Sequence, residues 1–244
     1  MISRVAEILR TVWFFVVVVL ASIPSCTAWI LMSPITRLLG DPQRHLGHYF
    51  STLWARTIVG LQPWWRVRVE GREHLAPRGE AVVYVANHQH EIDILLLFQL
   101  RTRFRWLSKM SVFHVPLIGW SMWATGYVGV VRGSHKSHAK SKAQSLAHLA
   151  AGTPMLFFPE GTFGDGTKLD FKTGAFRLAQ EAKASIVPIT VGGSKQLFRG
   201  KCVQPGDVHI RVFPRIELED RTAAELSELA RAVMEPALGL GDGS

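Results

Sequence analysis

The sequence predicts an α/β fold in which helices flank a mostly parallel sheet, preceded by a helical segment that associates with a membrane. Short apolar runs at 81–86 and 156–158 each lead into a polar turn, as buried strands do at their carboxyl ends. A basic amphipathic pattern over 134–151 has the length of a crossover helix between parallel strands. With 244 residues, 48% of them hydrophobic, the chain is long enough for one α/β domain plus an appendage.

The N-terminal segment carries no charged residue from 11 to 36. About 20 apolar residues suffice to cross the hydrocarbon of a bilayer. Basic residues flank this run on both sides, so the positive-inside rule leaves its orientation open. Pro24 offers an alternative in which two shorter helices lie in one leaflet, and a signal peptide is a further alternative. We expect membrane attachment, whether spanning or monotopic.

The remaining elements are predicted in chain order. They are a connecting helix over 41–60, a strand over 66–69, a loop over 71–79, a helix from about 93, a strand over 128–131, a helix ending at 183, strands over 186–191 and 208–213, and a C-terminal helix capped by Asp220 or Thr222 and ending near Met234. Pro188 predicts a strand start or a bulge at its position. We therefore expect N-terminal membrane-associating helices over 1–60, an α/β domain over 61–236 and a flexible tail over 237–244.

Polar residues follow the first buried strand in the order Asn87-His88-Gln89-His90-Glu91-Ile92-Asp93. Ligands of open α/β sheets gather at the carboxyl ends of strands, and His88 lies at such an end. Asp93 lies near the first turn of the next helix, where its carboxylate can bond one ring nitrogen of His88 and leave the other as a base. Such a base can remove a proton from a substrate hydroxyl. The alternative is that both residues only cap and orient the turn.

A second polar turn follows the strand at 156–158. Its residues Pro159-Glu160-Gly161-Thr162 leave the strand direction and bring a carboxylate and a hydroxyl to the strand end. Polar turns at the ends of two apolar strands indicate a shared cleft.

The segment from 94 to 159 contains no Asp or Glu, but it contains eight of the basic residues in a chain of net charge +9. These are Arg101, Arg103, Arg105, Lys109, Arg132, Lys136, Lys140 and Lys142. The charge indicates an anionic partner. Three partners fit: lipid head groups, a phosphorylated substrate, and nucleic acid. No nucleic-acid module is recognised, and a membrane-anchored nucleic-acid binder is kept as the alternative from another class. Trp120, Trp123 and Tyr127 are predicted to fill an apolar wall.

Several site types are not supported by the sequence. Cys26 and Cys202 suggest no disulfide framework, and no Cys/His pair has zinc-site spacing, so we expect no metal. The glycines of 161–168 are spaced as in a phosphate-binding loop, but Thr precedes Lys where the motif requires Lys first, which argues against nucleotide hydrolysis. The segment 119–123 lacks the last glycine of a nucleophile elbow, so no acyl-enzyme is expected.

Taken together, the blocks Asn-His-Gln-His-Glu-Ile-Asp and Phe-Pro-Glu-Gly-Thr, with Gly126 to Arg132 between them, resemble the signature blocks of the glycerolipid acyltransferases. The resemblance is to the 1-acylglycerol-3-phosphate O-acyltransferases in particular and covers roughly residues 60 to 215. It implies a glycerolphosphate acyltransferase-like fold and transfer of a fatty acyl group from acyl-CoA or acyl-carrier protein to the sn-2 hydroxyl of 1-acyl-sn-glycerol-3-phosphate, which gives phosphatidic acid.

The resemblance also implies roles for individual residues. His88 and Asp93 are the expected catalytic residues, and the expected substrate-binding residues are Lys109, Arg132, Glu160, Gly161 and Thr162. No cofactor is implied beyond the acyl thioester, and the expected partners are the lysophospholipid, membrane lipids and an acyl-carrier protein, without nucleic acid. The implied location is a membrane, such as the bacterial inner membrane, with the active site on the cytoplasmic side.

Two positions depart from the family pattern. Phe163 stands where many phosphatidic-acid-forming members have Arg, which removes a bidentate phosphate donor. Either Lys168 or Lys172 compensates, or the acceptor is another lysolipid, such as a lyso-ornithine lipid. His90 stands where Ser is common, and it is either a rival base or a polar turn residue. A lysophospholipid hydrolase, with water as the acceptor, is a further alternative.

Overall fold

The computed structural model of the chain describes residues 2–41, 44–163 and 169–240. Within these ranges, a seven-stranded sheet has the strand order β1-β9-β6-β2-β5-β3-β4. Its strands are β1 (Trp65–Glu70), β2 (Val83–Ala86), β3 (Arg105–Lys109), β4 (Val128–Val130), β5 (Met155–Phe157), β6 (Ile186–Gly192) and β9 (Gly206–Val212). All neighbours are parallel except β6 and β9. The predicted α/β fold with a mostly parallel sheet is confirmed.

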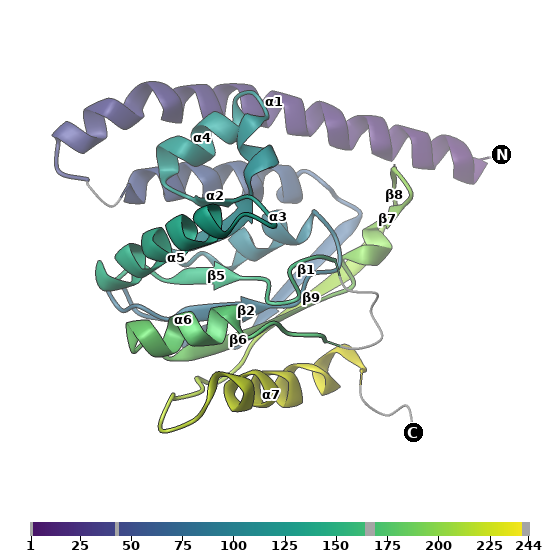
Figure 1. Ribbon diagram of the computed structural model, residues 1–244. Helices are drawn as coiled ribbons and strands as arrows, with labels where there is room; N and C mark the ends of the chain where they lie inside the picture. The colour runs from purple at the N-terminus through teal and green to yellow at the C-terminus, as the bar shows by residue number, and fades with distance from the viewer. Residues whose placement is uncertain (1, 42–43, 164–168, 241–244) are drawn as a thin grey trace.

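Helices cover both faces of the sheet (Figure 1). They are α1 (Ile2–Leu38), α2 (His45–Gly60), α3 (Asp93–Leu97), α4 (Ile118–Thr125), α5 (His135–Ala150), α6 (Gly174–Ala182) and α7 (Ala223–Met234). Successive strand residues point to opposite faces. Tyr84 and Ala86 of β2 accordingly join a core with α1 to α4, whereas Val83 and Val85 join a core with α5 to α7. The result is a three-layer arrangement in which both faces of the central strands are buried.

The N-terminal segment forms one helix, α1, which continues through Pro24 and Pro34. The alternative of two shorter helices separated at Pro24 is therefore wrong. Residues Arg4–Leu38 are long and apolar enough to cross a membrane, although a third of their most apolar stretch is buried within the protein. The helix lies along the top of the molecule in Figure 1, against α2 and α4. Near its start, the Glu7 carboxylate binds the Arg199 guanidinium at 2.6 Å.

Pro188 lies at the third position of β6, so the expectation that it starts the strand or forms a bulge is wrong. Its Cα pairs with Val85 of β2, and its carbonyl accepts the N–H of Phe213 at 3.0 Å. Because proline has no N–H, the reciprocal bond to the β9 side cannot form. The antiparallel ladder with β9 accordingly begins one residue later, at Ile189.

The remaining differences from the sequence prediction are local. Strand β3 was not predicted, and neither was a small hairpin of β7 (Phe198–Arg199) and β8 (Cys202–Val203). Tyr127 is buried as predicted, but Trp120 and Trp123 are exposed, so the prediction that they fill an apolar wall is wrong. A 3-10 helix over Pro236–Leu238 includes the first two residues of the predicted tail 237–244, of which 241–244 lie outside the described residues.

Candidate active site

The two polar turns leave neighbouring strands at the same edge of the sheet. Val85 of β2 pairs with Phe157 of β5 in parallel register, so the residues that follow each strand emerge side by side. The first residue after β2, Asn87, is buried and tied to β6. Its side-chain amide donates to the Val191 carbonyl at 3.0 Å and accepts the Val191 N–H at 2.8 Å. This pair of bonds fixes the start of the turn that carries His88.

His88 and Asp93 lie in direct contact. The His88 Nδ1 is 2.9 Å from Asp93 Oδ2, and the same oxygen accepts backbone N–H bonds from Gln89 at 2.7 Å and His90 at 2.9 Å. Because a carboxylate oxygen only accepts, Nδ1 is the donor in this bond, and in the neutral imidazole the lone pair is then on Nε2. The Asp93 side chain is 0% exposed and that of His88 is 13% exposed. The carboxylate is therefore shielded from solvent, while the imidazole lines the cleft.

Two phenylalanines hold the imidazole. The Phe158 ring stacks on His88 with a centroid distance of 4.0 Å and an angle of 15° between the planes. The Phe163 ring meets it edge-on at 4.5 Å and 63°. Their contacts leave the ring little freedom to rotate away from Asp93. Phe163, which stands where the sequence resemblance suggests an arginine, thus has a packing contact with the candidate base.

Glu160 also acts on His88, but through the backbone. Its Oε1 accepts the His88 N–H at 2.7 Å, and the side chain is buried. The carboxylate therefore links the turn after β5 to the turn after β2. Glu160 is not among the residues that line the cleft, whereas Gly161 and Thr162 are. A carboxylate at this place stabilises the relative position of the two turns more directly than it contacts a substrate.

Cationic groups converge on Gly161. Arg132, just beyond β4, donates a hydrogen bond to the Gly161 carbonyl. Gly161 has φ +72°, and a Cβ added there would lie 2.9 Å from the Nζ of Lys172. Glycine suits the left-handed backbone here, and the Lys172 ammonium lies next to the place that a Cβ would take. Lys168, the other residue considered as a replacement for the missing arginine, lies outside the described residues.

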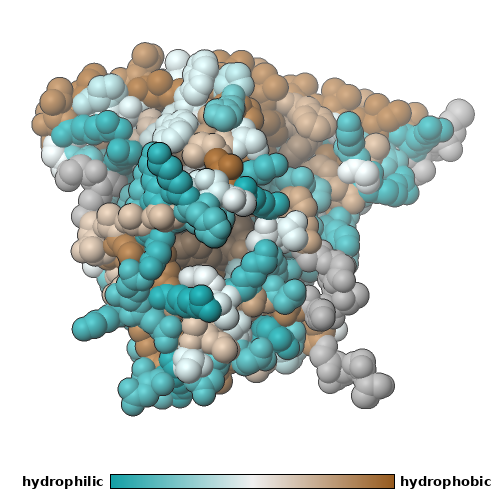
Figure 2. Space-filling view, viewed as in Figure 1, coloured by the Kyte–Doolittle hydropathy of each residue, from teal (hydrophilic) through white to brown (hydrophobic). Residues whose placement is uncertain are grey.

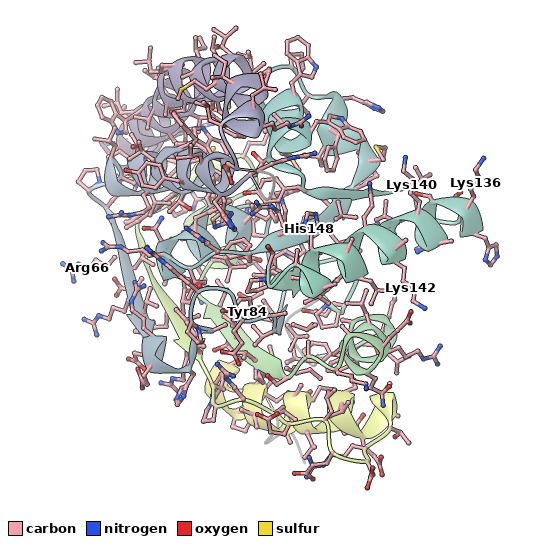
Figure 3. All side chains as sticks on the ribbon, turned by 90° about the vertical axis from the view of Figure 1, so that its left-hand side faces the viewer. Arg66, Tyr84, Lys136, Lys140, Lys142 and His148 are labelled. Carbon is pink, nitrogen blue, oxygen red and sulfur yellow. The ribbon has the colours of Figure 1, made fainter. Side chains whose placement is uncertain are left out.

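The site opens into a cleft of 1020 Å³ between α5 and α6, lined by His88 and by the end of β3 at Lys109. Figure 2 shows this face hollowed near its centre, with hydrophilic side chains around the hollow. Among the described residues, the charged groups that line the cleft are Lys109, Arg132, Lys142, Lys172, Arg177 and a single carboxylate, Glu91. Lys142 binds Glu181 of α6 at 2.5 Å, and Figure 3 shows it pointing from α5 toward α6. The cleft is suited to an anionic ligand.

The basic segment identified in the sequence does not act as one surface. Arg105 is fully buried in β3, where its guanidinium donates to the carbonyl oxygens of Phe104 and Arg44 and lies over the Tyr127 ring. Lys136 and Lys140 point away from the body of the protein (Figure 3). Only part of the positive charge of this segment therefore reaches the cleft.

An apolar cavity of 660 Å³ lies next to the cleft and was not predicted. Side chains of α1, α2 and α4 line it, including Phe14, Trp54 and Met122. Glu91, Ile94 and Val112 line both cavities, so the apolar space begins beside the turn that carries His88. Its dimensions and lining suit a hydrocarbon chain.

Two further histidines, the buried His48 and the partly buried His148, are structural. Burial lowers the pKa of His48 to about 3 and that of His148 to about 4. His48 Nε2 lies 2.9 Å from the Thr102 carbonyl, and His148 Nε2 lies 2.9 Å from the Gly126 carbonyl. Among the described residues, no group of three or more His, Cys, Asp or Glu side chains is arranged to hold a metal ion. The candidate chemistry is thus that of the pair His88 and Asp93.

Comparison with known proteins identifies related chains. The family model described as Acyltransferase matches residues 66–192. A 1-acyl-sn-glycerol-3-phosphate acyltransferase of Chlamydomonas reinhardtii is 37% identical over 234 residues, which cover 94% of this chain and 70% of the alga's protein. A chloroplastic 1-acyl-sn-glycerol-3-phosphate acyltransferase of Arabidopsis thaliana is 32% identical over 195 residues, with 80% of this chain and 54% of that protein covered.

A solved structure has the same fold. The crystal structure of the 1-acyl-sn-glycerophosphate acyltransferase PlsC from Thermotoga maritima superimposes with a TM-score of 0.76. The match covers 98% of this chain and 99% of that chain at 18% sequence identity. At this level of identity the likeness concerns the fold alone.

Proposed function

The chain belongs to the Acyltransferase family, and we propose that it transfers a fatty acyl group from an acyl thioester to the sn-2 hydroxyl of 1-acyl-sn-glycerol-3-phosphate, giving phosphatidic acid. The family makes it an O-acyltransferase, and its named relatives indicate the acceptor. The observation that carries the proposal for the site is the contact between His88 and Asp93 at the wall of a cationic cleft.

The reaction begins with proton transfer. Nε2 of His88 removes the proton from the acceptor hydroxyl, and the oxygen attacks the carbonyl carbon of the thioester. Asp93 stabilises the imidazolium that forms, since its buried carboxylate already contacts Nδ1. When the tetrahedral intermediate collapses, the carbon–sulfur bond breaks and the thiolate takes the proton from His88. The products are the two-chain lipid and a free thiol, and no acyl-enzyme is formed.

The cations of the cleft hold the acceptor's phosphate in this proposal. Lys109, at the end of β3, and Arg132, just beyond β4, line the cleft. Lys172 lines it as well, with its ammonium group next to Gly161. Arg132 uses one guanidinium nitrogen on the Gly161 carbonyl, and its remaining N–H groups are available to phosphate. Thr162 supplies a hydroxyl at the rim. Glu160 has a positioning role, through the His88 backbone.

The donor's acyl chain occupies the apolar cavity. A chain that enters past Ile94 and Val112 carries its thioester to the place where the two cavities meet, beside His88. The donor is acyl-CoA or acyl-carrier protein, which share the thioester. No metal or further cofactor has a step in this mechanism.

The membrane supplies the acceptor. One side of α1 packs on the protein, while apolar residues such as Leu9, Leu20 and Leu31 are exposed along its length. A helix held flat against its own domain in this way suits a position in the interface of one leaflet better than a span across the bilayer. We place the active site on the cytoplasmic side, where acyl thioesters are available.

The direct test is an assay of purified protein with labelled acyl-CoA and a panel of acceptors, followed by chromatography of the lipids. Phosphatidic acid is the expected product with lysophosphatidate. His88→Ala is expected to lower its formation about 100-fold or more, while the protein remains folded. A preference for lyso-ornithine lipid would replace the acceptor, because Phe163 removes one bidentate phosphate donor of the family pattern. Release of free fatty acid alone would instead indicate a hydrolase.

A further inference from the structure

Helix α4 exposes two tryptophans on one side. The side chains of Trp120 and Trp123 are 53% and 44% exposed, whereas the intervening Met122 is buried. The two positions are three residues apart and so lie on the same face of the helix. Ile118, Ser121 and Met122 instead line the apolar cavity. Two large aromatic side chains are thus directed outward by a short helix whose other face is already packed.

These tryptophans continue the exposed apolar surface of α1. The two helices pack against each other, and Figure 1 shows α4 beside α1, with α7 at the opposite end of the molecule. In Figure 2 hydrophobic residues gather along the edge formed by α1. Val115, shortly before α4, is exposed as well. Exposed large apolar residues gathered on neighbouring segments of the chain are typical of a binding surface.

The charges near α4 favour an anionic partner for this surface. Arg44 donates to the Trp123 carbonyl at 3.1 Å, and Arg37 and Arg103 lie in the same region, near Arg44 and His45. The carboxylate of Asp41 is engaged by backbone N–H groups at the start of α2. Tryptophan prefers the interface between hydrocarbon and head groups, and nearby arginines strengthen binding to anionic lipid.

We propose that Trp120 and Trp123 form a second membrane contact, which docks α4 into the interface of an anionic leaflet beside α1. This inference rests on the proposed membrane-embedded acceptor. A single helix lying on a bilayer leaves the attached domain free to roll about the helix axis. A second contact away from that axis stops the rolling and fixes the orientation of the cleft relative to the leaflet.

The position of α4 can be measured with a fluorescent label. The protein Cys26→Ala/Cys202→Ser receives one new cysteine, Trp120→Cys, labelled with bimane and mixed with vesicles of phosphatidylcholine and phosphatidylglycerol that contain doxyl-labelled lipid. Matched variants are Trp13→Cys on α1 and Leu229→Cys on α7, both at exposed apolar positions. We expect vesicles to quench the labels at positions 13 and 120 several-fold more than the label at 229. Quenching at 13 but not at 120 would overturn the proposal and leave membrane attachment by α1 intact.

A kinetic experiment tests the consequence. Trp120→Ser/Trp123→Ser is compared with Leu229→Ser/Val233→Ser, which removes two exposed apolar side chains from α7. We expect the first variant to raise KM about tenfold for lysophosphatidate presented in anionic vesicles, with turnover of a short-chain, monomeric lysophosphatidate unchanged. An equal KM in vesicles for both variants would contradict a role for α4. Loss of turnover on the monomeric acceptor would also contradict it, because the defect would then lie in the catalytic site.

Discussion

Replacement of Asp93 by Asn tests the catalytic pair at the atom on which it depends. One carboxylate oxygen receives three donors, from the His88 ring and from two backbone N–H groups. Hydrogen bonds to a charged acceptor contribute about 1 kcal/mol more than neutral ones, so the amide loses about 3 kcal/mol of stability over three bonds. Asp93 Oδ1 is buried without a hydrogen-bond partner among the described residues. An amide nitrogen placed there adds about 1–3 kcal/mol for its unpaired donors.

The effect on catalysis is separate from the effect on folding. In the transition state His88 becomes charged, and a neutral amide cannot stabilise the imidazolium as a buried carboxylate does. A loss of about 3–4 kcal/mol corresponds to a 100- to 1000-fold fall in kcat. The KM for lysophosphatidate should change little, because Asp93 does not line the cleft.

The assay combines two measurements on the same protein. Thiol release from acyl-CoA gives kcat and KM, and urea denaturation gives the free energy of unfolding. Asp207→Asn, at an exposed position in β9, is the matched control and should change neither. If Asp93→Asn keeps more than a tenth of the wild-type kcat while His88→Ala is inactive, the proposed stabilisation of the imidazolium by Asp93 is refuted.

Three further predictions concern the cleft and the core. Lys172→Met should raise KM for lysophosphatidate roughly tenfold with little change in kcat, as expected for a contact made equally in ground and transition states. The control is Lys183→Met, at the exposed end of α6. An unchanged KM in Lys172→Met would remove Lys172 from the phosphate site. Gly161→Ala should raise the KM for lysophosphatidate and destabilise the fold by about 1–2 kcal/mol, because φ is +72° and the new Cβ meets the Lys172 ammonium. If the kinetics and the urea midpoint stay unaltered, the turn tolerates a side chain. The free energy of unfolding should fall as the pH drops from 6.5 toward 4, since the unfolded chain protonates His48 and His148 there while burial lowers their folded pKa to about 3 and about 4. Each of the two histidines contributes about 1.4 kcal/mol per pH unit to the pH dependence of the free energy of unfolding. The urea midpoint of His48→Gln should therefore depend less on pH than that of the wild type. An equal pH dependence would exclude His48 as a source of the effect.

The sequence predicted the features that depend on strand ends and local signals. Parallel neighbours place their carboxyl ends together, so His88 and Glu160 were expected to meet, and the His88 N–H does bind the Glu160 carboxylate. The C-terminal helix begins where Thr222 suggested, with the Thr222 and Glu225 capping box formed. Both predictions rest on interactions between residues that are close in the chain or held by a regular sheet.

The features that the sequence did not predict depend on packing between distant segments. Strand β3 begins at Arg105, a residue type that argues against burial, and its buried position requires the Arg44 carbonyl from another element. Side chains of α1, α2 and α4 together line the apolar cavity, so the sequence of any one of these helices does not predict it. The place of Lys172 beneath Gly161 depends on a left-handed turn whose neighbours are fixed only in the folded chain.

Phe163 connects these observations with the choice of acceptor. Where many members of the family have an arginine, this chain has the Phe163 ring, whose centroid lies 4.5 Å from that of the His88 imidazole. An arginine there would bring positive charge next to His88 and disfavour the imidazolium that the mechanism requires. Because Arg132 and Lys172 already bring positive charge to the turn at Gly161, we propose that the site separates two tasks. In the proposed mechanism Arg132 and Lys172 bind the phosphate, while the imidazole packs against Phe158 and Phe163 and keeps Asp93 as its charged partner.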